Sequence, residues 1–332
     1  MLKRWQKIVG VSFLSLALLA ACGTSDEDEA ANGGGEETSD EFTVGISQYV
    51  THPSLDEATK GFKQAIEDSG LNVEFLDQNA QGDSNNAATI AQNLVSDDVD
   101  LIFANATPSA VAAMNATSEI PVVFTSVTDP VDAQLVSSVE EPGGNATGTT
   151  DSHPDAIPNT INFINDEMDV ESVGVIYNAG EPNSVVQMNA VEEAVEGTDL
   201  ELVQATVSNS SEVKQAAESM VGRADVFFIF TDNTVVSALE SVIDVANNEQ
   251  IPLFVGELDS VDRGGLAAYG FSYYDIGYKA GEMAVEILKG EKEPSELKVE
   301  YPPNLELVIN RDAAEKMGVE IKPEWEEFAE IQ

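Results

Sequence analysis

The chain of 332 residues has few residues of three kinds on which many protein functions depend. It has 15 lysines and arginines against 60 aspartates and glutamates, which gives a formal net charge of −45. A surface this acidic repels phosphate groups, which argues against nucleic-acid binding and against adhesion to anionic lipid through a basic face. Two histidines and one cysteine leave almost nothing for zinc, iron–sulfur or thiol chemistry. We therefore expect no metal, no cofactor and no nucleic-acid partner.

The only cysteine, Cys22, ends an N-terminal segment that is typical of exported proteins. Three basic residues precede an apolar run over 8–21, which is too short to span a membrane comfortably. The run ends in Leu19-Ala20-Ala21-Cys22, which resembles the lipobox of bacterial lipoproteins, where the cysteine thiol is acylated before cleavage. An ordinary signal peptide with an incidental cysteine is the alternative. The segment predicts a signal peptide over 1–21 and a lipid anchor at Cys22 on the outer side of the cell membrane.

A polar segment follows over 22–41. After the cysteine it contains eight acidic residues, three consecutive glycines and no aliphatic residue larger than alanine. A segment of this composition cannot bury a core, and we predict a solvated tether. Its role would be to let a folded domain work away from the membrane.

From Phe42 onward, short apolar strands alternate with amphipathic helices in two successive series. The first series has expected strands over 42–49, 71–76, 99–104 and 120–126, and helices over 54–69, over 84–95 and from 109, with Ser54 as the N-cap of the first helix. The second has expected strands over 173–177, 201–207, 225–230 and 251–255, and helices over 184–195, 212–221 and 234–247. This order predicts an α/β fold with doubly wound parallel sheets.

The two series resemble one another in sequence. Val44-Gly45-Ile46 matches Val173-Gly174-Val175, and Ile120-Pro121-Val122 matches Ile251-Pro252-Leu253 at a similar offset. We therefore predict two α/β lobes, over 42–150 and 151–270, joined by crossover hinges near 141–151 and near 264–273. The remaining residues, 271–332, are expected to supply a crossover, a helix and a C-terminal segment that packs back on the lobes.

Seven short motifs stand in order along the chain. They are His52-Pro53-Ser54-Leu55-Asp56, Asn79-Ala80-Gln81-Gly82-Asp83, Ala106-Thr107-Pro108, Pro121–Pro130, Pro142–Gly148, Tyr177–Ser184 and Thr231-Asp232-Asn233. Together they resemble the ABC transporter substrate-binding family that includes tryptophan- and tyrosine-type binding lipoproteins. The resemblance covers nearly all of 42–323. It implies a fold like that of type I periplasmic binding proteins, with no enzymatic activity.

The same resemblance implies what the protein binds and where it works. The ligand would be a small amino acid, with tryptophan, tyrosine or phenylalanine first. A monomeric, extracytoplasmic protein would deliver it to an ABC permease and its cytoplasmic ATPase.

Candidate ligand-binding residues of the first lobe follow its predicted strands, because ligands of open α/β sheets bind at the carboxyl ends of the strands. They are Gln48, Tyr49, His52, Asn79, Thr107, Ser126 and Thr128. Most carry neutral hydroxyls or amides, which together with helix N-termini suit a carboxylate without a full countercharge. We favour Thr107, Ser126 and Thr128 for a ligand carboxylate. Helix caps and Ser/Thr turns are the alternative interpretation, and His52 could equally be a turn residue beside Pro53.

The corresponding positions of the second lobe include more acidic side chains. They are Tyr177, Glu181, Asn183, Ser184, Asp232, Asn233 and Glu257. A carboxylate in a cleft can pair with an ammonium group, and burial strengthens that pairing. We favour Asp232, which directly follows an apolar strand, and then Glu257. Chance placement is the alternative in so acidic a chain. Aromatic candidates for stacking on a ligand ring include Tyr49, Tyr177, Phe271 and Tyr273.

Other functions stay open at this point. A different amino acid, a sugar or a nucleoside could be the ligand, and the protein could sense its ligand instead of delivering it. An α/β hydrolase is disfavoured because the chain has no Gly-x-Ser-x-Gly elbow, P-loop or Gly-x-Gly-x-x-Gly fingerprint.

Overall fold

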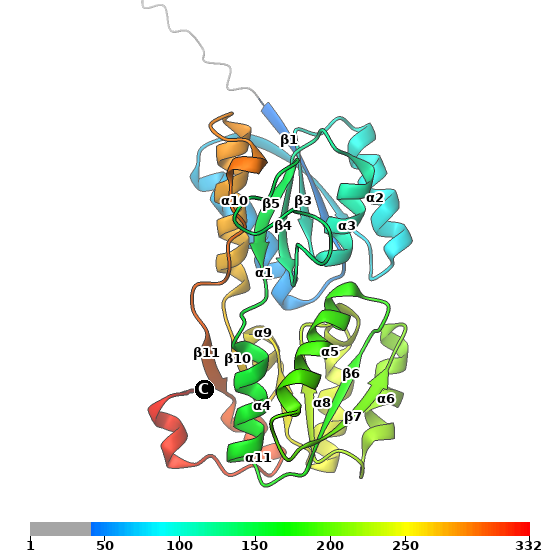
Figure 1. The fold of residues 1–332 in the computed structure, drawn as a ribbon, viewed down its shortest axis with the longest axis vertical. Helices are drawn as coiled ribbons and strands as arrows, with labels where there is room; N and C mark the ends of the chain where they lie inside the picture. Colours follow the sequence, from blue (N-terminus) through cyan, green and yellow to red (C-terminus); the bar gives the residue numbers. More distant parts are fainter. Residues whose placement is uncertain (1–40) are drawn as a thin grey trace, which may run out of the picture. The chain divides into compact units, whose positions relative to one another are not determined.

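The computed structural model describes residues 41–332, so the predicted signal peptide, Cys22 and the tether up to residue 40 lie outside the described residues. The first sheet has the strand order β2-β1-β3-β4-β5, with every pair parallel (Figure 1). Its strands are β1 (Glu41–Gln48), β2 (Asn72–Asn79), β3 (Leu101–Asn105), β4 (Val122–Val127) and β5 (Ala146–Thr150). We call this sheet and its helices the N-terminal lobe.

Both faces of this sheet are covered by helices. The helices α1 (Pro53–Asp68) and α10 (Tyr273–Leu288) pack together, as do α2 (Ser84–Ser96) and α3 (Thr107–Ala116). Phe103 of β3 stacks on Phe62 of α1, with ring centroids 3.8 Å apart, whereas its neighbour Ile102 belongs to the cluster that contains Leu94 of α2. Burial on both faces explains the continuous apolar runs in the sequence.

Glycines set the distance between α1 and α10. A Cβ atom added at Gly277 would lie 1.9 Å from the carbonyl oxygen of Ala58, and one added at Gly61 would lie 2.1 Å from that of Tyr274. Real Cβ contacts are never this short, so the two backbones approach closely only because both positions lack a side chain. This contact fixes α10, which comes from far along the chain, onto the N-terminal lobe.

We predict that Gly277→Ala lowers the free energy of unfolding by about 1–3 kcal/mol, because the added methyl group overpacks the α1–α10 contact. In an exposed helix the same change would be stabilising, because alanine has the higher helix propensity. Urea unfolding followed by circular dichroism measures the effect. Gly197→Ala is the matched control, since its Cβ would meet no atom within 4 Å. Equal stability of the two variants would contradict this account of the packing.

The second sheet has the strand order β12-β11-β10-β9-β8-β6-β7. Its strands are β6 (Ser172–Tyr177), β7 (Glu201–Thr206), β8 (Val226–Ile229), β9 (Leu253–Val255), β10 (Ala267–Gly270), β11 (Glu306–Ile309) and β12 (Glu330–Ile331). The strand β11 runs antiparallel to β10, and the other pairs are parallel. We call this sheet and its helices the C-terminal lobe.

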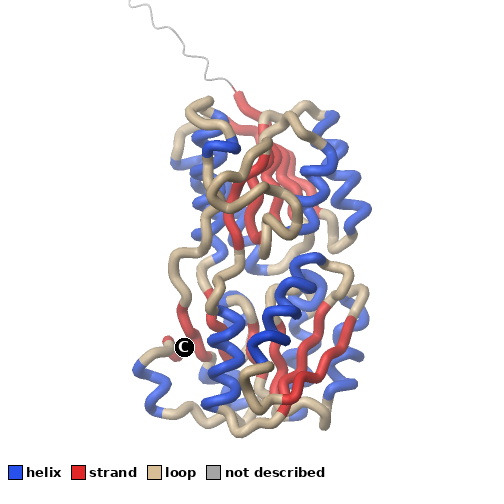
Figure 2. The backbone as a smooth tube through the Cα atoms, viewed as in Figure 1, coloured by secondary structure: helices blue, strands red, loops and turns tan. Residues whose placement is uncertain are grey.

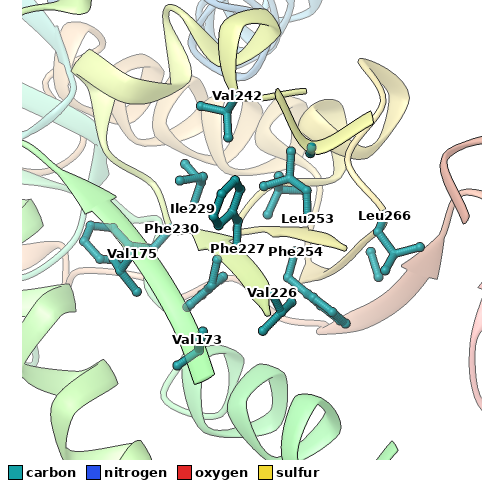
Figure 3. Packing of buried hydrophobic residues seen from close by; sticks show 14 of the residues in the cluster. Val173, Val175, Val226, Phe227, Ile229, Phe230, Val242, Leu253, Phe254 and Leu266 are labelled. Atoms are coloured by element: carbon teal, nitrogen blue, oxygen red, sulfur yellow. The ribbon is translucent and has the colours of Figure 1, made fainter. Parts of the chain in front are cut away.

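The helices of this lobe form two packed pairs and several short pieces. The helix α4 (Ala156–Glu167) packs on α5 (Pro182–Val195), and α6 (Val213–Met220) packs on α8 (Leu239–Glu249). The short helices are α7 (Asn233–Val236), α9 (Leu258–Asp262) and α11 (Arg311–Lys316). Two 3₁₀ turns, over Ser210–Glu212 and Pro323–Glu327, complete this lobe. A third, over Pro294–Glu296, contacts β5 of the N-terminal lobe. Figure 3 shows the core, where side chains of β8 and β9 such as Phe227 and Phe254 gather.

Three segments of the described chain cross between the lobes (Figure 2). They are 151–155 after β5, 271–272 between β10 and α10, and 297–305 before β11. The third runs beside the end of β5, because Glu300 forms a parallel bridge with Thr149 and its carbonyl accepts a hydrogen bond of 2.9 Å from the Thr150 N–H. The sequence analysis placed its two crossovers near 141–151 and near 264–273, and of the tail it expected that it would return to the lobes.

The predicted α/β class with parallel sheets is confirmed, and two local predictions are wrong. His52, not Ser54, occupies the N-cap of α1, because Pro53 starts the helix at its first position. The single helix expected over 234–247 is two helices, α7 and α8, separated at Ser237 and Ala238. The strand β5 was not foreseen, because its sequence Ala-Thr-Gly-Thr-Thr has no large apolar residue. None of the described helices is long and apolar enough to cross a membrane.

Candidate functional site

Loops that follow the strands of the two lobes make direct contact. The Ser54 hydroxyl, near the start of α1, donates a hydrogen bond of 2.8 Å to Glu257, the N-cap of α9. Both side chains are buried. The Thr128 hydroxyl, just after β4, donates a hydrogen bond of 3.1 Å to Asp151 in the first crossing segment. These contacts define an interlobe site at the ends of the strands.

Two residues at this site have a backbone conformation that is uncommon outside glycine. Ala106 has a φ of 85° and Ser126 a φ of 56°. Such conformations cost about 1–3 kcal/mol and cluster at ligand sites. Ser126 lies where the pairing of β4 with β5 loses its register, between Phe124 and Val127. Irregularities of this kind re-aim a side chain.

The hydroxyl of Ser126 is buried and has no hydrogen-bond partner among the described residues. Thr107 begins α3, and its hydroxyl oxygen accepts a long hydrogen bond of 3.4 Å from the Thr128 N–H. Thr107 and Thr128 are also buried. The three hydroxyls favoured for a ligand carboxylate therefore lie together at the N-terminus of α3, where backbone N–H groups also favour an anion.

Two other residues predicted for the N-terminal lobe, Tyr49 and His52, are buried. Tyr49 is buried and donates to the Gly82 carbonyl at 3.0 Å. His52 is buried, its Nδ1 atom has no described partner, and desolvation lowers its pKa to about 4, so the imidazole is neutral near pH 7.

Gln48 and Asn79 make only local hydrogen bonds. The Gln48 amide donates to Asp56 and accepts from Thr59, both at 2.7 Å, which braces α1 against β1. Asn79 donates to Thr51 at 3.1 Å and accepts from the Gln81 N–H at 2.8 Å within the turn after β2. These partners leave the two amides occupied within their own lobe.

Two buried carboxylates of the C-terminal lobe meet at the start of α7. Asp232 caps this helix, accepting from the Val235 N–H at 2.8 Å, and it also accepts from the Ser184 hydroxyl and the Asn178 N–H, both at 2.6 Å. Burial and the neighbouring Glu181 charge raise the pKa of Asp232 to about 7. The sequence did not reveal this capping role.

Glu181 is enclosed by donors. It accepts from the N–H and hydroxyl of Thr234 at 3.0 and 2.6 Å and from the Asn233 amide at 2.7 Å. Asn183 contributes a longer contact of 3.4 Å, and its own Oδ1 atom is buried without a described partner. Tyr177 is only partly buried and tilts against Phe230, with ring centroids 6.2 Å apart.

Glu257 and Asp151 lie where the lobes adjoin. One oxygen of Glu257 accepts from both Ser54 and Ser260, at 2.8 and 2.9 Å, and burial raises its pKa. Asp151 accepts from Thr128 on one oxygen and from the Tyr273 hydroxyl on the other, at 3.1 and 2.9 Å, and desolvation raises its pKa to about 6. Sequence reasoning missed Asp151 because the strand before it, β5, was not recognised.

No lysine or arginine of residues 41–332 lies within 4.0 Å of Asp151, Glu181, Asp232 or Glu257. Enclosed carboxylates with only neutral donors are costly, and a cationic ligand group would compensate them. Within the same residues, no group of three or more histidine, cysteine or acidic side chains is placed to hold a metal ion.

We predict that the ligand-free protein becomes more stable as the pH falls from 8 to 5. The raised pKa values of Asp151 and Asp232 mean that the folded state binds protons more tightly than the unfolded state, so stability is lost as the pH rises through about 6 and 7. The lowered pKa of His52 opposes part of this gain, because the unfolded state takes up the imidazole proton first as the pH falls below 6.5. The expected net gain is about 1–3 kcal/mol, measured by urea unfolding at several pH values. Asp151→Asn should reduce this gain, and Asp155→Asn, which removes a largely exposed charge from the same segment, should not. Stability that falls on acidification to pH 5 would contradict the prediction.

Comparison with known proteins decides the family. A family model described as ABC transporter substrate binding protein matches residues 43–329. The chain belongs to this family. Its members bind solutes and are not enzymes. This confirms the resemblance found in the sequence and makes the protein the substrate-binding protein of an ABC transporter.

Two similar proteins have names that mention aromatic amino acids. A tyrosine-binding protein of Clostridioides difficile is 40% identical over 96% of this chain and 93% of its own length. The structure of an ABC domain from Streptococcus pneumonia in complex with L-Trp has a TM-score of 0.82 at 28% identity, covering 88% of this chain and 100% of the other. A ligand-free, open substrate-binding protein with adhesive properties from Clostridium difficile has a TM-score of 0.64 at 36% identity, covering 88% and 99%.

The L-Trp complex is less identical to this chain than the ligand-free relative is, yet it has the higher TM-score. The structure therefore superposes better on the L-Trp complex than on the ligand-free, open relative.

Proposed function

We propose that this protein binds an aromatic L-amino acid, tyrosine, tryptophan or phenylalanine, between its lobes and delivers it to the permease of an ABC importer. One observation carries the proposal. Buried neutral hydroxyls on the N-terminal lobe adjoin carboxylates that have no lysine or arginine within 4.0 Å among residues 41–332. A free amino acid carries one group of each complementary kind, a carboxylate and an ammonium.

The ligand carboxylate would bind at the start of α3. The unpartnered Ser126 hydroxyl and the Thr107 hydroxyl can donate to it, and the backbone N–H groups of the first turn add their partial positive charge. We expect neutral donors to be sufficient for this carboxylate. A buried lysine or arginine would be left without a partner whenever the ligand leaves the site, which is costly.

The aromatic part of the proposal rests on two supports. The names of the relatives mention tyrosine and L-Trp. The ends of β8 and β10 also bring aromatic rings to the site, including Phe230 and Phe271, and Phe271 stacks on Tyr273 with ring centroids 5.6 Å apart. Aromatic rings packed in this way suit an aromatic ligand side chain.

The place of action is also part of the proposal. We propose a lipid anchor at Cys22, a tether over 22–41 and lobes over 42–150 and 151–270 completed by 271–332, working as a monomer outside the cytoplasm. The lipobox and the composition of the tether support this organisation. The dense acidic surface would keep the exported lobes soluble.

We predict that L-tyrosine, L-tryptophan and L-phenylalanine raise the melting temperature, whereas their carboxamides, D-glucose and adenosine do not. Ligand at 100 times its Kd stabilises a protein by about 2.7 kcal/mol, which is easily measured. Titration calorimetry should show that Ser126→Ala weakens binding about 10- to 100-fold, through loss of a hydrogen bond to a charged group. Ser118→Ala, an exposed serine of the same lobe, is the control. Stabilisation by the sugar or nucleoside alone would overturn the amino-acid proposal.

We predict that Cys22→Ser abolishes lipidation, because only the thiol can be acylated. In a bacterial host, the wild-type chain should incorporate radioactive palmitate and partition into the detergent phase of Triton X-114, and the variant should do neither. Ser25→Ala, three residues along the tether, should behave like the wild type. Equal partitioning of Cys22→Ser and wild type would show that the lipobox is not used.

A further inference from the structure

Two neighbouring helices of the N-terminal lobe carry no charge. Charged residues make up 23% of the chain, yet none lies among the 13 residues of α2 or the 10 residues of α3. Every other described α-helix except α7, which has 4 residues, contains at least one aspartate, glutamate, lysine or arginine. The helices α2 and α3 pack side by side (Figure 1), so the missing charges leave one continuous neutral area.

Burial does not explain this absence of charge, because much of α2 faces solvent. Its exposed residues are neutral and polar, among them Asn85, Thr89, Gln92, Asn93 and Ser96. The hydroxyls of Thr89 and Ser96 donate to carbonyls one turn earlier in the same helix, at 2.9 and 2.8 Å, so neither has a proton left to donate outward. On α3, Val111 and Met114 are partly exposed. The area is therefore neutral and in part apolar.

A groove lies between these helices and the C-terminal lobe. It has a volume of about 330 Å³, and no charged residue lines it. Its wall includes Gln92, Pro108, Val111 and Asn115 from the N-terminal lobe and Gly180 and Pro182 from the C-terminal lobe. The groove has this form only while the two lobes adjoin, because both lobes contribute to its wall.

The start of α5 extends the neutral area onto the C-terminal lobe. The helix α3 contacts α5, which begins at Pro182 and has no charged residue before Glu192. Val185 lies three positions after Pro182, on the same face of the helix, and 42% of its surface is exposed. We call α2, α3 and the first two turns of α5 the uncharged surface.

We propose that the permease of the ABC transporter docks on the uncharged surface, through apolar and neutral side chains instead of basic ones. This inference rests on the proposed function and deepens it, because it gives the delivery step a surface and states the chemistry of the partner.

The charge distribution favours this surface over the rest of the protein. Depletion of charged residues distinguishes the core of a protein interface from other surface areas, and the rim of an interface is polar. Acidic residues return at the edge of the uncharged surface, where Asp83 and Asp97 cap the two ends of α2. Hydrated carboxylates are costly to cover unless each gains a partner. On a chain with a net charge of −45, another protein covers the uncharged surface at a lower cost.

The contribution of both lobes would let the permease distinguish the closed protein from the open one. Opening of the lobes would move Gly180 and Pro182 away from α3 and break up the groove. A partner that fills the groove therefore binds the closed form more tightly, and this difference in affinity shifts the lobes toward closure. A partner that touched one lobe alone would bind both forms equally.

The proposal is tested by adding charge with little change of shape. The double variant Gln92→Glu with Asn115→Asp adds one carboxylate to each helix, at exposed positions of the groove. The control, Gln215→Glu with Asn248→Asp, adds the same two charges at exposed positions of α6 and α8. Titration calorimetry should show that both variants bind L-tyrosine as the wild type does.

Docking is measured on the permease and ATPase of the same transporter in nanodiscs, by surface plasmon resonance and by ATPase activity. Loaded with L-tyrosine, the wild type and the control should bind equally and stimulate the ATPase. The surface variant should bind about 10- to 100-fold more weakly, because its added charges would be covered without a partner. Equal or tighter binding of the surface variant would overturn the proposal, and tighter binding would show that the permease presents basic residues there.

Two further measurements separate the other occupants. A wild-type dimer in sedimentation that the surface variant abolishes would assign the surface to a second copy of the chain. Binding to protein-free phosphatidylglycerol vesicles that the surface variant abolishes would assign it to the membrane, and either result would overturn permease docking. If the wild type binds no aromatic amino acid, or stimulates no ATPase with one bound, the proposed function itself fails. That failure is recognised from the wild type alone, before any variant is compared.

Discussion

The cost of enclosing carboxylates without a basic partner is the constraint on which the interlobe site depends. Asp151, Glu181, Asp232 and Glu257 are surrounded by hydroxyls, amides and backbone N–H groups, and none has a lysine or arginine within 4.0 Å among the described residues. Neutral donors offset only part of the desolvation cost, and the pKa values of Asp151, Asp232 and Glu257 rise accordingly. In the function proposed above, the ammonium group of the ligand would offset the remaining cost.

The chain path makes this arrangement possible. The helix α10 leaves the C-terminal lobe after β10 and is fixed on α1 by the glycine contact, which sets Tyr273 beside Asp151. The third crossing segment is bonded through Glu300 to Thr150, the last residue of β5, directly before the first crossing segment. Residues that touch at the site therefore come from opposite ends of the sequence, as the 203 positions between Ser54 and Glu257 illustrate. Bending at the crossing segments would separate these partners, which is the motion that such two-lobed folds use.

Much of the fold could be predicted because its signals are local. The strands β3, β4 and β8 are continuous apolar runs, and caps and glycines mark the helix ends. The strand β5 was not recognised because its burial comes from β4 and α10, which pack against it, and not from large apolar side chains of its own. Asp151, which follows β5, was therefore not identified as a site residue. Asp232 looked like a ligand carboxylate, and only the folded backbone of α7 shows that it caps a helix.

The sequence by itself determined the alternation of strands and helices, the family and the chemical types available at the strand ends. These depend on side-chain periodicity and short motifs, which a linear chain displays directly. The tertiary structure alone decided which hydroxyl lacks a partner, which carboxylates are already bonded, and that Ser126 turns with a positive φ at an irregularity of the sheet. Those properties depend on contacts between residues that are distant in the sequence, such as Ser184 with Asp232 and Asp151 with Tyr273, and no local pattern encodes such contacts.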